Sequence, residues 1–179
     1  DAVMEALLPK VEALVAGNQL EDGSNVGPMV READAARVES WLNEAESAGA
    51  KILTGGQRSG ALMQPALIDD VTSDMRISRE ELFGPAVGVH KVKDIEEAVR
   101  LANDTPFGLS AGVFTQDIDA AMRFAQEIQS GNIHINWGTM WRTDCMPFGG
   151  LKGSGTGKEG PKYAVEEMTE MKTVVIHSK

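Results

Sequence analysis

The chain has 179 residues, of which 42% are hydrophobic and 25% are charged, the ordinary balance of a globular protein. Its net charge of −10 at pH 7, with lysines and arginines scattered along the chain, argues against nucleic acid and anionic membrane surfaces as partners. The single cysteine, Cys145, excludes an internal disulfide, and the sequence shows neither a signal peptide nor an apolar run of the roughly 20 residues that a membrane span needs, so we expect a cytoplasmic protein.

Apolar residues at helical spacing predict two helices in the first part of the chain. The first runs from residue 2 to residue 16 and stops at Gly17, and a polar loop follows it. The second runs from about Arg31 to Ala48, and its apolar face consists of Ala35, Val38, Trp41, Leu42 and Ala45.

Short apolar segments near glycines predict strands further on. These strands are expected at 50–55, 62–69 and 85–92, with a short helix or turn at 73–79. Asp94 is then a plausible N-cap, because Glu97 follows it three positions later in a capping-box arrangement.

The pattern becomes regular after this cap. A strand at 109–115, a helix capped by Asp117 and a strand at 132–136 follow one another with short connections. This alternation predicts an α/β fold, with a parallel-type sheet and helical crossovers. A glycine-rich loop at 137–160 leads to a helix near 161–168, and residues 171–177 read as a last strand.

The domain organisation expected from these elements is simple. One α/β domain covers residues 1–170, and residues 171–179 form a terminal strand. That strand either joins the edge of its own sheet or pairs with a neighbouring subunit. Both interpretations predict oligomerisation, because an unpaired strand edge favours association.

Glu81 and Phe83 come directly before a Gly84-Pro85 bend. A carboxylate at this place is able to accept hydrogen bonds from the hydroxyls of a ribose, and an adjacent aromatic ring is able to cover a nicotinamide face. The structural alternative is that Glu81 caps a turn and that Phe83 belongs to the core.

The loop 136–148 (NWGTMWRTDCMPF) combines apolar rings with a few polar groups, which is the composition of a small-molecule pocket. Trp141 is one of its candidate pocket walls. The Arg142 guanidinium is suited to gripping an anionic group. Its structural alternative is an ion pair with Asp144 that only shapes the loop.

Glu159 follows the glycine-rich stretch, and from the residues alone it is a first-turn carboxylate of the next helix, where it is favourable with the helix dipole. Cys145 has no base nearby in the sequence, and His90, His134 and His177 all fall in predicted strands. No metal-ligand spacing occurs in the sequence.

Two segments together resemble the C-terminal part of the NAD(P)-dependent aldehyde dehydrogenases: EELFGPAVGV at 80–89 and MPFGGLKGSGTGKEG at 146–160. The resemblance implies that Glu81 and Phe83 contact the nicotinamide ribose of NAD or NADP. It also implies that the loop ending at Phe148 lines the substrate tunnel, that Glu159 relays protons or fixes that loop, and that the last strand pairs subunits into a dimer or tetramer.

The same resemblance implies that the nucleophilic cysteine of the family lies upstream of this chain, since nothing before Cys145 matches its F-x-x-x-G-Q-x-C context. The chain begins at Asp1, directly in a helical pattern, so we expect a piece of a larger enzyme that is inactive alone. That enzyme would oxidise a small, anionic aldehyde through a cysteine thiohemiacetal. The segment from Trp141 to Lys172 looks similar to lactaldehyde, phosphonoacetaldehyde and succinate semialdehyde dehydrogenases.

A different class of function stays open. The chain would then be a standalone α/β binding or assembly module that docks on a full-length dehydrogenase through its terminal strand. A generic Rossmann-like cofactor protein is a weaker alternative, because no G-x-G-x-x-G follows a first strand.

Overall fold

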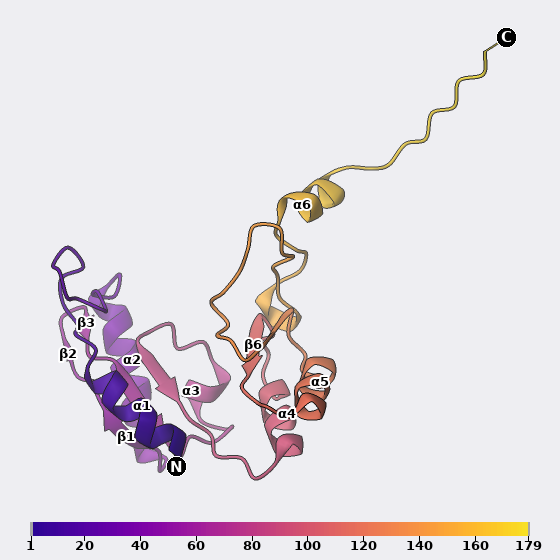
Figure 1. Cartoon of the computed structure of the whole chain (residues 1–179). Coiled ribbons are helices and arrows are strands. Elements are labelled where there is room, and N and C mark those ends of the chain that lie inside the picture. Colours follow the sequence, from indigo (N-terminus) through magenta and orange to yellow (C-terminus); the bar gives the residue numbers. More distant parts are fainter. Residues whose placement is uncertain (1, 179) are drawn as a thin grey trace. The chain divides into compact units, whose positions relative to one another are not determined.

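The computed structural model describes residues 2–178, and the chain divides into two units, one up to Val92 and one from Lys93 (Figure 1). The boundary lies inside the stretch 1–170 for which one domain was expected. None of the described helices is long and apolar enough to cross a membrane.

The first unit contains both predicted helices, α1 (Ala2–Glu12) and α2 (Glu32–Ser47). The buried residues of α2 confirm the predicted apolar face, namely Ala35, Val38, Trp41, Leu42 and Ala45. The prediction that α1 continues to residue 16 was wrong. The backbone at Val15 and Gly17 bonds instead to Asn25 and Val26, and these bonds replace the helical ones.

A three-stranded sheet in the order β1-β4-β5 forms the centre of this unit, with β1 (Lys51–Thr54) antiparallel and β5 (Ala86–Gly88) parallel to β4 (Ala66–Asp69). The sheet is therefore mixed, although only parallel pairing was expected. Ala66, Leu67 and Ile68 of β4 are buried, and the core of the unit joins Ala66 and Ile68 to Val38 and Leu42 of α2. The short helix α3 (Arg76–Arg79) stands where a helix or turn was predicted.

The predicted strand at 62–69 is two strands. Its first part, β3 (Leu62–Met63), forms a small hairpin with β2 (Arg58–Ser59), and its second part is β4. The break falls at Gln64-Pro65, because proline has no backbone N–H with which to continue a ladder.

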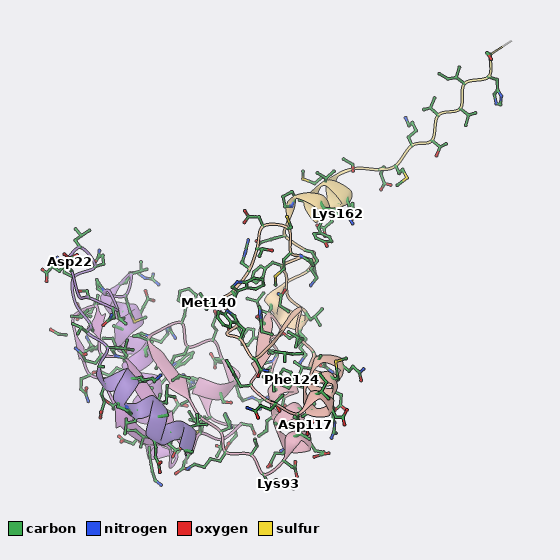
Figure 2. The ribbon with its side chains drawn as sticks, viewed as in Figure 1. Asp22, Lys93, Asp117, Phe124, Met140 and Lys162 are labelled. Carbon is green, nitrogen blue, oxygen red and sulfur yellow. The ribbon has the colours of Figure 1, made fainter. Side chains whose placement is uncertain are left out.

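The second unit contains the predicted strand-helix-strand arrangement. The strands β6 (Ser110–Val113) and β7 (Asn132–Ile135) pair in parallel, and α5 (Ile118–Glu127) connects them. Phe124 of α5, labelled in Figure 2, belongs to a core cluster with Ile128 and with Val99 of α4 (Ile95–Asn103). The class of fold is α/β, as predicted.

Both predicted caps in this unit are formed. The Asp117 carboxylate accepts hydrogen bonds from the backbone N–H groups of Asp119 and Ala120 at the start of α5. The Asp94 carboxylate accepts one from Glu97 at the start of α4. The Glu97 carboxylate reaches back to the backbone N–H of Lys93, one position before the cap.

After β7 the chain runs through a long loop that contains a short 3-10 helix, η1 (Lys152–Ser154), and then forms α6 (Pro161–Met168). Residues 171–178 are exposed and pair with no strand among the described residues. The interpretation of this segment as an edge strand of its own sheet was therefore wrong, and its pairing with another subunit stays a prediction.

Candidate functional site

The first candidate surface is the turn between α3 and β5, which carries Glu81 and Phe83. Both side chains are exposed, Phe83 by 74%, so Phe83 is not the core residue of the structural alternative. The backbone of Phe83 has a φ of 47°, in the left-handed region that non-glycine residues seldom adopt. An exposed ring on a strained backbone indicates a position held for contact with something else.

Helix α2 holds this turn in place. The Arg37 guanidinium donates a hydrogen bond of 2.8 Å to the Leu82 carbonyl oxygen. The residue after Phe83 has room for no side chain, because even a Cβ at Gly84 would lie 2.7 Å from Cγ2 of Val38. Sequence reasoning missed Arg37, which lies 45 positions from Leu82.

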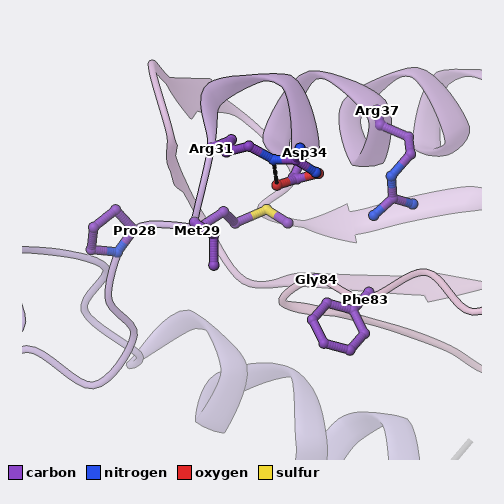
Figure 3. Close-up of a pocket in the computed structure, with 8 residues that line it drawn as sticks. Pro28, Met29, Arg31, Asp34, Arg37, Phe83 and Gly84 are labelled. Atoms are coloured by element: carbon purple, nitrogen blue, oxygen red, sulfur yellow. Dashed lines mark hydrogen bonds and ion pairs between the residues drawn. The ribbon is translucent and has the colours of Figure 1, made fainter.

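Phe83 and Gly84 line a cavity of about 500 Å³ together with residues 28–31 and the first turns of α2 (Figure 3). One wall carries the paired Arg31 and Asp34, whose side chains make two hydrogen bonds of 2.9 and 2.8 Å. The hydrogen bonds from Arg31 hold the pKa of the Asp34 carboxyl below its usual value. The rest of the lining is largely apolar, with Met29 and the Phe83 ring exposed to the hollow, a combination that suits a planar ligand carrying polar groups.

The second candidate surface lies in the other unit and joins Arg142, Phe148 and Glu159. The backbones of Phe148 and Glu159 exchange N–H···O hydrogen bonds of 3.1 and 2.6 Å in an antiparallel bridge. The Arg142 guanidinium lies over the Phe148 ring, 4.5 Å from its centroid, and forms an ion pair with the Glu159 carboxylate at 3.4 Å. The alternative that Arg142 pairs with Asp144 was wrong, since its partner is Glu159.

Trp141, the third predicted pocket residue of this loop, packs against the sheet. Its ring meets the ring of His134 edge to face, with centroids 6.4 Å apart and planes at 85°. His134 is buried in β7, which confirms its interpretation as a sheet residue. The contact ties the aromatic end of the loop to the strand.

The glycine-rich segment that follows borders a cavity of about 340 Å³, whose lining includes Phe148 and Glu159. Glu167 of α6 reaches back to this segment and accepts a hydrogen bond of 3.1 Å from the backbone N–H of Lys158. The Lys158 ammonium donates one of 3.0 Å to the Gly149 carbonyl. Sequence reasoning also missed Glu167, because a glutamate in a predicted helix cannot be told from an ordinary solvent-exposed residue by sequence alone.

The remaining candidates form no further site among residues 2–178. Cys145 is exposed and carries a free thiol. His90 lies after β5, where its Nε2 is 3.1 Å from the Ser78 hydroxyl, and burial lowers the pKa of its imidazole. No group of acidic, histidine or cysteine side chains in this range is arranged to hold a metal ion.

These observations define an α/β protein with two separate surfaces suited to small molecules, one per unit. The comparison with known proteins then gives the family. A model of the aldehyde dehydrogenase family matches residues 1–174, and the chain belongs to this family.

Relatives with curated names match nearly the whole chain. It is 46% identical over 176 residues to the 3-sulfolactaldehyde dehydrogenase of Priestia megaterium. The matched region covers 98% of this chain and 37% of that protein. It is 44% identical over 182 residues to the lactaldehyde dehydrogenase of Methanococcus vannielii, with coverages of 99% and 39%. The chain thus spans little more than a third of the length of these relatives.

Solved structures agree. The glyceraldehyde-3-phosphate dehydrogenase of Methanocaldococcus jannaschii, complexed with NADP, superposes with a TM-score of 0.93 at 37% identity, over 98% of this chain and 38% of that one. Aldehyde dehydrogenase 21 of Physcomitrella patens, in complex with the reaction product succinate, superposes with a TM-score of 0.92 at 40% identity. The match covers 95% of this chain and 35% of that one. The family and the fold class predicted from the sequence are therefore confirmed.

Proposed function

We propose that the chain is part of an NAD(P)-dependent aldehyde dehydrogenase and that its first unit contacts the cofactor. The residues present suit the nicotinamide ribose. The exposed Phe83 ring lines a cavity of about 500 Å³, and Glu81, two positions earlier in the chain and also exposed, carries a carboxylate able to accept hydrogen bonds from ribose hydroxyls. A nicotinamide held there would supply the hydride acceptor for the oxidation of the aldehyde. The role of Phe83 and Glu81 is to orient it.

The nucleophile in this proposal comes from outside these 179 residues. An aldehyde dehydrogenase of this type needs a thiolate activated by a base or by its surroundings. Cys145 is exposed, and no base among the described residues makes a hydrogen bond to its thiol. The 179-residue chain alone, given an aldehyde and NAD or NADP, is therefore expected to produce no reduced cofactor in an absorbance assay. Turnover by the chain alone would overturn the proposal.

The proposed substrate is a short aldehyde with an anionic far end, and Arg142 grips that end. The observation that carries this is the placement of the Arg142 guanidinium on the Phe148 ring, half exposed and paired with Glu159 at only 3.4 Å, so that a carboxylate, sulfonate or phosphate is able to reach it. Two of the relatives' names support the same class, since sulfolactaldehyde carries a sulfonate and succinate carries two carboxylates, whereas the lactaldehyde named for others is uncharged.

The test compares two aldehydes of equal length, succinate semialdehyde and butyraldehyde, with the full-length protein that contains this chain. Arg142→Leu is expected to raise KM for the anionic aldehyde by about 10- to 100-fold, the value of a hydrogen-bonded charge pair, and to leave KM for the neutral one nearly unchanged. Equal effects on both substrates would end the assignment of Arg142.

We propose in addition that residues 171–178 pair with a second copy of the protein. The segment is exposed to solvent, with Met171 exposed by 98% and Ile176 by 89%. Apolar side chains of this kind are stabilised by burial against a partner. The same observation favours the alternative of an assembly module that docks on a dehydrogenase. Removal of residues 171–179 from the full-length protein is expected to lower its native mass, measured by light scattering. An unchanged number of subunits would remove the homo-oligomer role from this segment.

A further inference from the structure

Arg142 forms an ion pair with Glu159 in this chain, and the geometry of the pair shows how firmly it is held. Its Nη1 and Nη2 atoms both approach the same oxygen, Oε2 of Glu159, each at 3.4 Å. A strong arginine-carboxylate pair uses two nitrogens and two oxygens at roughly 2.7–2.9 Å. Arg31 and Asp34 in the same chain do form such a fork, at 2.9 and 2.8 Å. The Arg142–Glu159 pair is therefore a loose one.

Both partners are also open to solvent. The side chain of Arg142 is 48% exposed and that of Glu159 is 69% exposed. Water screens such a pair, so that it contributes little to stability and exchanges easily. Another anion is therefore able to displace the Glu159 carboxylate from Arg142 at little cost in free energy.

The backbone, in contrast, is fixed. Phe148 and Glu159 are held together by their two backbone hydrogen bonds, and the guanidinium rests on the Phe148 ring. Loss of the Glu159 carboxylate contact would therefore leave Arg142 on its aromatic support, with its N–H edge available. The arrangement keeps the cation oriented whichever anion occupies it.

We propose that Glu159 is the resident counter-ion of Arg142 and that the far-end anion of the substrate displaces it. Substrate binding thereby frees the Glu159 carboxylate. This inference rests on the proposed function, in which Arg142 grips an anionic substrate. It adds that binding and the release of Glu159 are one event, an exchange of ion pairs in which no covalent bond changes. The freed carboxylate is then able to take up the proton-relay role expected of it.

The test measures equilibrium binding rather than turnover, because Glu159 has a predicted catalytic role. The full-length protein is titrated calorimetrically with succinate and with butyrate, two acids of equal length of which only the first has a far-end anion. Wild-type protein is expected to prefer succinate, and Arg142→Met is expected to lose that preference. Glu159→Gln, which keeps the side-chain size and the backbone bridge, is expected to bind succinate about two- to fivefold more tightly, in line with the value of a half-exposed ion pair. Its affinity for butyrate should stay the same.

A matched variant controls for net charge. Glu166 on α6 pairs with Lys162 at 3.9 Å and is 62% exposed, so Glu166→Gln removes the same charge from the same unit without touching Arg142. This variant is expected to bind succinate as the wild type does. A similar gain in Glu159→Gln and Glu166→Gln would reduce the effect to overall charge and overturn the exchange.

The outcomes separate the two levels of the proposal. Loss of the preference in Arg142→Met without a gain in Glu159→Gln would overturn the exchange and keep Arg142 as the anion grip. An unchanged preference in Arg142→Met, or none in the wild type, would overturn both. Arg142→Lys provides a second variant if the methionine variant folds poorly. It should retain part of the preference, since a lysine keeps the charge but not the planar fork.

Discussion

The Arg37 guanidinium and the Leu82 carbonyl oxygen are joined by a hydrogen bond of 2.8 Å across 45 positions of the chain. The guanidinium also lies over the Trp41 ring, 4.8 Å from its centroid, and this contact fixes its position on α2. Leu82 is the residue before Phe83, whose φ of 47° is strained. The bond therefore connects the rigid helix to the turn that carries the candidate cofactor contacts.

Replacement of Arg37 by methionine is expected to lower the free energy of unfolding by about 1–3 kcal/mol, because the Leu82 carbonyl loses a charged donor. In the full-length protein we also expect a higher KM for the cofactor and little change in kcat, since the turn positions Phe83 and does no chemistry. Urea denaturation and initial-rate kinetics measure the two effects. Arg100→Met is the control, because the exposed pair of Arg100 with Glu97 at 3.5 Å contributes only about 0–1 kcal/mol and Arg100 does not line the cavity. Equal losses in the two variants would contradict the special role of Arg37.

A second prediction concerns the close approach of two backbone segments at Gly131. A Cβ at this position would lie 1.7 Å from the carbonyl oxygen of Gly149, a distance that no rotamer change relieves. Gly131→Ala is therefore expected to cost about 1–3 kcal/mol or more and to displace the segment next to Phe148. Gly138→Ala is the matched control, since nothing lies within 4 Å of its Cβ. Its expected change in unfolding free energy is within about 0.5 kcal/mol.

Local patterns in the sequence predicted the second unit well. The caps Asp94 and Asp117 and the apolar positions of α5 act within a few residues, so their effect is visible without knowledge of the fold. The antiparallel pairing of β1 with β4 and the early end of α1 depend on partners further along the chain. Periodicity carries no information about such partners, so these predictions were wrong or incomplete.

The candidate sites also divide into residues that local motifs predict and contacts that depend on distant parts of the chain. Glu81, Phe83, Arg142, Trp141, Phe148 and Glu159 stand in motifs that can be read one by one from the sequence. The pairing of Arg142 with Glu159 instead of Asp144 could not be predicted, because it depends on the backbone bridge between Phe148 and Glu159. Arg37 and Glu167 carry no sequence signal, since each acts on a distant backbone group.

The cap of α5 offers a direct measure of one local interaction. The Asp117 carboxylate satisfies the N–H groups of Asp119 and Ala120, at 2.9 and 3.2 Å, which have no partner inside the helix. Asp117→Ala is expected to destabilise the second unit by about 0.5–2 kcal/mol, and Asp117→Asn by less, because asparagine also caps. Thermal unfolding followed by circular dichroism is the measurement. An alanine variant as stable as the wild type would show that water replaces the cap without loss.

The ion cluster at the end of β4 makes stability depend on pH. Lys51 and Lys91 bond the Asp70 carboxylate at 2.7 and 2.9 Å and lower its pKa from 3.8 to about 2. Since the folded state holds this proton less tightly than the unfolded state, the stabilisation is fully present above pH 3.8 and is lost as the pH falls towards 2. Asp70→Asn should flatten the fall in the urea midpoint over this range. It is the suitable change, because asparagine tolerates the φ of 56° at this position.

Some slope in the pH profile should remain in Asp70→Asn, since Lys91 also lowers the pKa of Asp69. At about 1 M salt the difference between variant and wild type should shrink, because the lysine partners of Asp70 are open to screening, with Lys51 67% and Lys91 51% exposed. A variant whose pH profile matches that of the wild type would show that the cluster does not control the acid sensitivity of this unit.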